Sequence, residues 1–128
     1  DSVESIGEMC FRGQTALAHY VHENARDLYG YNKPAVKALQ YGLGNLEDMQ
    51  LGAVGKPVTI IYKDAFSNNN APSTAVFTIY TTGDRVDTLL TAMRTYLTAP
   101  TIVFKASEAT TYNGTSYAAG DTIVTSTP

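Results

Sequence analysis

The chain has 128 residues, of which 44% are apolar and 16% charged, and its formal net charge is −3 at pH 7. A chain of this length can bury a core without a metal or disulfide staple. Its nine basic residues are scattered, which argues against nucleic acid as a partner because phosphate binding needs a basic stripe. No apolar run approaches the roughly 20 residues of a membrane-spanning helix. The sequence contains no recognisable signal peptide and opens at Asp1 without Met, so whether Asp1 is a processed terminus stays open.

The first segment is predicted to be a long amphipathic helix from Val3 to Tyr29. Its apolar residues recur at three- and four-residue steps, which is the spacing of one helical face. Such a helix is longer than a compact domain of this size requires, so we expect a neighbouring copy to cover part of the apolar face. The predicted assembly interface consists of Val3, Ile6, Cys10 and Leu17. On this apolar face, Cys10 is interpreted as an inert buried thiol.

A second helix is predicted after the stretch "YGYNKPAV" (29–36), in which Gly30 can end the first helix and Pro34 can begin the next. It runs to about Gln50. Its apolar face consists of Val36, Leu39, Leu43 and Leu46.

From Pro57 the pattern changes to that of strands. The runs "PVTIIYK" (57–63) and "STAVFTIYT" (73–81) are rich in β-branched and aromatic residues. Apolar residues fall on both faces of each run, which predicts a sheet that is covered on both faces. The polar stretch between the two runs is predicted to be a loop.

The segment "GDRVDTLLTAMRTYLTAP" (83–100) is predicted to be a helix that ends before Pro100. Asp84 and Asp87 suit its N-terminal turn, where carboxylates are favourable. Strands follow at "TIVFKA" (101–106) and "TIVTS" (122–126). The apolar face of the helix consists of Val86, Leu89, Leu90, Met93 and Leu97.

A hairpin is predicted around Asn113-Gly114, the preferred pair for a two-residue type I′ turn. Tyr112 and Thr115 would then stand at the base of the turn, with Tyr117 farther along the returning strand. The same residues match the N-glycosylation pattern Asn-x-Thr, which is short and frequent by chance. The fold class predicted for residues 1–128 is a single α+β domain. Its helical part spans 1–50, and its sheet-rich part, with a mixed or antiparallel sheet and one further helix, spans 57–128.

Two motifs suggest chemistry but depart from its requirements. "HYVHE" places His19 and His22 three residues apart, whereas the zinc-protease helix needs His-Glu-x-x-His, and no third ligand is apparent. "LGAVGKP" (51–57) differs from a phosphate loop in its glycine spacing and in the proline after its lysine. We therefore predict no catalytic residue, no cofactor and no metal. The role of the two histidines stays open.

The segment "TYNGTSYAAGDTI" (111–123) resembles a short β element, Tyr-Asn-Gly-x-x-Tyr-x-x-Gly-Asp, of tailed-phage virion proteins and of some small carbohydrate-binding modules. The resemblance covers none of the N-terminal half. In the carbohydrate-binding modules a tryptophan usually joins the tyrosines as a sugar platform, and this chain has none. The resemblance therefore implies virion structure ahead of sugar binding.

These observations predict a non-enzymatic structural protein that assembles with copies of itself, and with other particle proteins, as a capsid or tail component in a virion or another extracellular particle. The alternative is an extracellular adhesion or carbohydrate-binding module, in which Tyr112, Tyr117 and Tyr80 contact the partner. A small enzyme is a third hypothesis, and it would require carboxylates such as Asp64, Asp84 or Asp121 to converge in a pocket.

Overall fold

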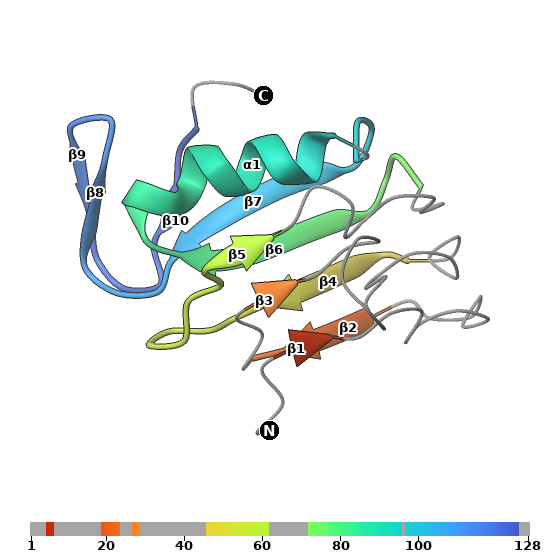
Figure 1. Cartoon of the computed structure of the whole chain (residues 1–128), viewed down its shortest axis with the longest axis horizontal. Helices are drawn as coiled ribbons and strands as arrows, with labels where there is room; N and C mark the ends of the chain where they lie inside the picture. The colour runs from red at the N-terminus through yellow and green to blue at the C-terminus, as the bar shows by residue number, and fades with distance from the viewer. Residues whose placement is uncertain are drawn as a thin grey trace.

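The computed structural model describes residues 5–6, 19–23, 27–28, 46–61, 72–95 and 97–125. These residues form strands, one 3₁₀ turn and one α-helix (Figure 1). In chain order the elements are β1 (Ser5–Ile6), β2 (His19–His22), β3 (Asp27–Leu28), β4 (Asp48–Leu51), β5 (Ile60–Ile61), β6 (Val76–Thr81), η1 (Gly83–Arg85), α1 (Val86–Arg94), β7 (Thr101–Ala106), β8 (Thr110–Tyr112), β9 (Thr115–Tyr117) and β10 (Thr122–Ile123).

The main sheet has five strands in the order β10-β7-β6-β4-β2. The four strands β2, β4, β6 and β7 are parallel, and β10 is antiparallel to β7. The register is continuous across the sheet, since Asp48 pairs with both His19 and Val76. The fold is α+β with a mixed sheet, as the sequence predicted.

The chain alternates between this sheet and a second, smaller parallel sheet of order β1-β3-β5. In chain order, β1, β3 and β5 join the smaller sheet, and they alternate with β2, β4 and β6, which join the main sheet. After β6, α1 lies beside β5 instead of a further strand of the smaller sheet. In Figure 1, α1, β5, β3 and β1 accordingly follow one another in a layer over the main sheet. Both layers therefore gain their elements in the same order along the chain, as in solenoid proteins, whose repeats contact mainly their neighbours.

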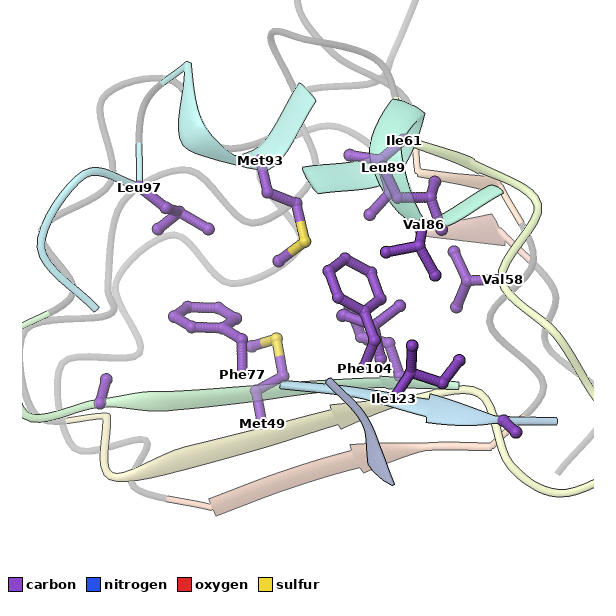
Figure 2. Packing of buried hydrophobic residues seen from close by; sticks show 14 of the residues in the cluster. Met49, Val58, Ile61, Phe77, Val86, Leu89, Met93, Leu97, Phe104 and Ile123 are labelled. Carbon is purple, nitrogen blue, oxygen red and sulfur yellow. The ribbon is translucent and has the colours of Figure 1, made fainter. Parts of the chain in front are cut away.

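The core lies between these layers. Phe77, Met49, Phe104 and Ile123 project from one face of the main sheet toward α1 and β5 (Figure 2). Helix α1 contributes Val86, Leu89 and Met93, which are buried, so its predicted apolar face is confirmed for these residues. Leu97 is buried just beyond the helix, and Leu90 packs against the core from a half-buried position.

Arg94 and Thr95 both donate hydrogen bonds to backbone carbonyls at the end of α1, Thr95 to the carbonyl of Thr91. Arg94 donates through Nη1 to the carbonyl oxygens of Leu97 and Pro100, each at 2.8 Å. These contacts hold the turn that leads into β7 and place a cation at the negative end of the helix, where it is favourable. The helix was predicted to end at Pro100, but α1 ends at Arg94, and residues 97–100 lead into β7 without helical structure.

The two predicted N-terminal helices are not found among the described residues. Within Val3–Tyr29 the structure describes β1, β2 and β3, and the end of the second predicted helix is β4. The prediction is wrong for these residues because each of them pairs with a parallel neighbour instead of forming a helical turn. The rest of both predicted helices lies outside the described residues. A division at residue 50 would also cut through β4, which belongs to the main sheet.

The predicted hairpin is confirmed. Tyr112 pairs with Thr115, and Asn113 and Gly114 both have positive φ (49° and 80°), as a type I′ turn requires. A second turn follows at Ala118–Asp121, where Gly120 has a positive φ of 88° and the N–H of Asp121 donates to the carbonyl of Ala118. The strand predicted after it is shorter than expected and consists of β10.

Candidate functional site

The predicted contact residue Tyr112 is turned inward. Its side chain is only 8% exposed, and its hydroxyl donates a 2.6 Å hydrogen bond to Oδ1 of Asp87 on α1. The accepting carboxylate raises the pKa of the Tyr112 hydroxyl, because loss of the proton would place two negative oxygens together. Little of this ring is left for stacking on a ligand. Tyr112 instead joins the hairpin to the helix.

The second predicted contact residue, Tyr117, is half-buried and packs against the core. Its hydroxyl accepts a 3.2 Å hydrogen bond from the backbone N–H of Val124, just after β10. The two tyrosines thus connect the hairpin to two different elements. The prediction that they contact a partner stays untested, but their hydroxyls already have partners within the chain.

The hairpin also approaches the start of α1 very closely. The N–H of Gly83 donates to Oγ1 of Thr110 at 2.9 Å, and a Cβ at Gly83 would collide with the carbonyl group of Thr111. Only glycine allows this approach of two backbones. The hairpin therefore covers the point at which β6 leads into α1.

Of the carboxylates considered for catalysis, the two that the structure describes, Asp84 and Asp121, each accept a hydrogen bond within their own turn. Asp84 accepts a hydrogen bond from the Thr82 hydroxyl, which lowers the pKa of the Asp84 carboxyl, and it is exposed. Asp121 accepts a 2.9 Å bond from the N–H of Ala118, which closes the turn before β10. Asp64 lies outside the described residues. Within the described ranges no group of three or more His, Cys, Asp or Glu side chains is placed to hold a metal ion.

A shallow depression of about 510 Å³ lies along the solvent-exposed side of α1. Every described residue that lines it belongs to this helix or the turn after it, so within the described ranges it gathers no groups from different elements. It offers one carboxylate and three hydroxyls on an open surface. The lining consists of Asp87, Thr88, Thr91, Ala92 and Thr95.

The residues of the predicted N-terminal interface are placed only in part. Ile6 ends β1, where its backbone pairs with Leu28. Val3, Cys10 and Leu17 lie outside the described residues, so that interface stays a prediction. His19 and His22 occupy the two ends of β2 and pair through the backbone with Asp48 and Leu51.

The register of the main sheet identifies a surface that the sequence did not reveal. On β6, Phe77, Ile79 and Thr81 are buried, while Val76, Thr78 and Tyr80 alternate with them on the opposite face. We call this opposite face the outer face. Strand pairing extends it to the neighbouring strands, and its further register positions are His19, Val21, Asp48, Gln50, Thr101, Val103, Lys105 and Thr122.

The outer face carries two of the exposed large apolar side chains among the described residues. Val21 on β2 is 54% exposed and stands in one row with Gln50, Thr78 and Val103. Val124 is 70% exposed. It directly follows the inward-pointing Ile123, the last residue of β10, and a continued alternation of side chains would direct it to the outer side. The paired row therefore crosses β2, β4, β6 and β7 and begins with an exposed valine, and Val124 lies beyond its other end, just after β10.

The described elements cover only one face of this sheet. Helix α1 and β5 both lie on the inner side (Figure 2), and no described element lies against the outer face. Parallel sheets are nearly always covered on both faces. The prediction of two covered faces is thus confirmed by the described residues for the inner face only, which makes the outer face the candidate interaction surface.

Sequence reasoning missed this surface because the signal lies in the pairing of distant strands. The mixed apolar and polar character of Val76, Thr78 and Tyr80 was visible, but their alignment with Val21, Val103 and Val124 was not. In the described part of the chain, no helix has the length and apolarity needed to cross a bilayer. No protein-family model, no curated protein and no solved structure matches this chain.

Proposed function

We propose that this chain is a non-enzymatic structural protein that assembles with copies of itself through the outer face of its main sheet. The observation that carries the proposal is the row that begins at Val21, with Val124 beyond its other end, on the face of a largely parallel sheet that no described element covers. Covering this face in an assembly would remove both valines from water, and burial of apolar surface drives most protein association.

The composition supports the same function. Only 16% of the residues are charged, and the outer face carries mainly Thr, Val, Gln and Tyr. Faces with few charges can approach without the desolvation cost that charged groups impose. A capsid or tail component of a virion, or of another extracellular particle, is the class we propose. The resemblance of residues 111–123 to tailed-phage virion proteins supports that class.

The oligomeric state of the full chain tests the proposal. We expect mass photometry and sedimentation velocity to show association that increases with protein concentration. Val21→Lys and Val124→Lys should weaken it. Val54→Lys is the matched control, because Val54 is 56% exposed but lies in the 53–56 turn, off the outer face. A wild-type chain that stays monomeric at several hundred micromolar would overturn the proposal.

An adhesion or carbohydrate-binding module is the second candidate, and the position of Tyr80 favours it. Tyr80 lies half-buried on the outer face beside Lys105, so its ring belongs to an open surface, as a sugar platform requires. Tyr80→Ala is a cleaner test than a change at Tyr112, which is part of the core. Glycan-array binding that disappears in Tyr80→Ala, with unfolding unchanged, would support this alternative.

A further inference from the structure

We infer that η1, α1, β10 and the β8-β9 hairpin together form an end cap, which prevents strands of another chain from pairing with β7 and β5. A sheet leaves unpaired backbone N–H and C=O groups along its last strand, and a further strand can pair with them. Solenoid proteins therefore need special elements at their ends. The inference goes beyond the proposed function, because it concerns the edges of the two sheets and not the outer face.

In the main sheet, β10 covers the edge of β7. It runs antiparallel to β7 and pairs Ile123 with Phe104. The turn before β10 continues the ladder, since the N–H of Gly120 donates to the carbonyl of Ala106 at 2.7 Å and the N–H of Ala106 donates to the carbonyl of Asp121 at 2.9 Å. From Phe104 to Ala106, the side of β7 that a further parallel strand would use is thus already occupied.

Strand β10 itself offers little to a further strand. It is two residues long, so its own edge presents few N–H and C=O groups for pairing. The side chain of Ile123 is only 3% exposed and belongs to the core, which fixes β10 on the sheet. A short strand that is anchored in this way ends the sheet.

In the smaller sheet, α1 takes the place of a further strand beside β5 (Figure 1). A helix forms its backbone hydrogen bonds within itself, so it cannot be extended by strand pairing. Just before α1, Arg85 donates through Nη1 to the carbonyl oxygen of Thr59 at 3.2 Å, directly before β5. A side chain thus satisfies a carbonyl at the start of β5.

The hairpin connects the elements that cover the two edges. On one side, the Tyr112 hydroxyl donates to Asp87 on α1 at 2.6 Å. On the other side, the Tyr117 hydroxyl accepts a bond from the N–H of Val124, just after β10. The two tyrosines therefore have a role within the chain, because they join α1 and β10 into one cap.

Release of β10 in the full chain tests the inference. Gly120 has a φ of 88°, and Gly120→Pro removes its N–H donor and imposes a φ of about −65°. Gly55→Pro is the matched control. Gly55 has a φ of 77° and donates a 2.7 Å bond to the carbonyl of Ser107, but it lies in the 53–56 turn, outside the pairing of β7 with β10. We expect Gly120→Pro to form sedimenting, thioflavin-binding aggregates about tenfold faster than Gly55→Pro.

Two further measurements identify the edge that is responsible. Amide hydrogen exchange at Ala106 should become faster when β10 detaches, because this N–H then loses its acceptor. A synthetic peptide of residues 118–125 should slow the aggregation of Gly120→Pro by pairing with β7. The same peptide with Ile123→Asp should not, since a carboxylate is costly to bury in the core. In the full chain, Ile123→Asp is the second variant that releases β10.

The outcomes separate this inference from the proposed function. If Ala106 exchanges faster in either variant but aggregation is no faster than in Gly55→Pro, the cap is wrong and assembly through the outer face is unaffected. Unchanged exchange at Ala106 in both variants would also overturn the cap, because β10 would then not be what protects this edge. Faster aggregation that Val21→Lys abolishes would assign the association to the outer face and overturn the cap as well. Aggregation that persists with Val21→Lys and is slowed by the peptide would support the cap, even if the wild type stays monomeric and the proposed function fails.

Discussion

The two faces of the main sheet differ although the same strands build them. The inner face carries Phe77, Met49, Phe104 and Ile123, all buried under α1 and β5. The outer face carries Thr78, Gln50 and Val103, half-buried, with an exposed valine at each edge. The inner face thus supplies the buried core, and the outer face is the surface through which we propose that copies of the chain associate. Substitutions on the two faces should accordingly affect different properties.

The largest expected effect tests this division on neighbouring residues of β7. Phe104→Ala removes a ring that is 1% exposed and should lower the free energy of unfolding by about 3–5 kcal/mol. Val103→Ala, one residue earlier on the outer face, should cost about 1 kcal/mol or less. Urea unfolding of both variants measures the difference. Equal losses would contradict the assignment of the two faces.

The local signals of the C-terminal half sufficed to predict its elements. The apolar spacing from Val86 to Leu97 predicted α1, and Asn113-Gly114 predicted the hairpin turn, because each pattern is complete within a few residues. The pairing partners of the parallel strands could not be predicted from such local patterns. Asp48 pairs with His19 and Val76 across long connections, and no feature of "DMQL" (48–51) indicates those partners.

The N-terminal half shows how a helical pattern can mislead. The apolar spacing of Val3 to Leu28 suggested a helix, but the described strands β1 and β3 are two residues long, too short to display a strand period. The winding between two sheets is a structural repeat, yet the sequence shows no repeat that would predict it. The outer face is formed by strands that are distant in the sequence, so the sequence did not predict it either.

The next prediction concerns the hydrogen bond between Tyr112 and Asp87, which connects the β8-β9 hairpin to α1. Tyr112→Phe should lower the free energy of unfolding by about 1 kcal/mol, since one hydrogen bond is lost while the ring stays in place. Tyr117→Phe is the matched control in the same hairpin. Its loss should be smaller, because the hydrogen bond from Val124 is longer, at 3.2 Å, and lies at the surface.

The same bond predicts a dependence on pH. The pKa of Tyr112 is raised in the folded state, mainly by its hydrogen bond to Asp87. The folded chain therefore holds this proton more tightly than the unfolded chain. The stabilisation is fully present below the ordinary tyrosine pKa of about 10 and is lost as the pH rises through the higher folded value. The stability difference between the wild type and Tyr112→Phe should shrink above pH 10. A constant difference up to pH 12 would refute this.

A smaller effect of opposite sign is expected at Ser107, directly after β7. Its hydroxyl is buried and has no hydrogen-bond partner among the described residues. Ser107→Ala removes the unpaired group with little change in volume and should stabilise the chain by up to about 1 kcal/mol. Thr81→Val is the contrasting variant, because the Thr81 hydroxyl donates a 2.7 Å bond to the Val58 carbonyl. It should destabilise the chain. A clear loss of stability in Ser107→Ala would show that the hydroxyl has a partner.

The smallest expected effect on stability is the one that most sharpens the contrast between the faces. Val21→Lys and Val124→Lys alter side chains that are 54% and 70% exposed, so each should shift the free energy of unfolding by about 0.5 kcal/mol or less. Unfolding is measured at low micromolar concentration, where association does not contribute. The same two variants should reduce self-association, whereas Val54→Lys should change neither property. If Val21→Lys instead unfolds the chain, its side chain supports the monomer, and the outer face is part of the fold's own core rather than a surface reserved for assembly.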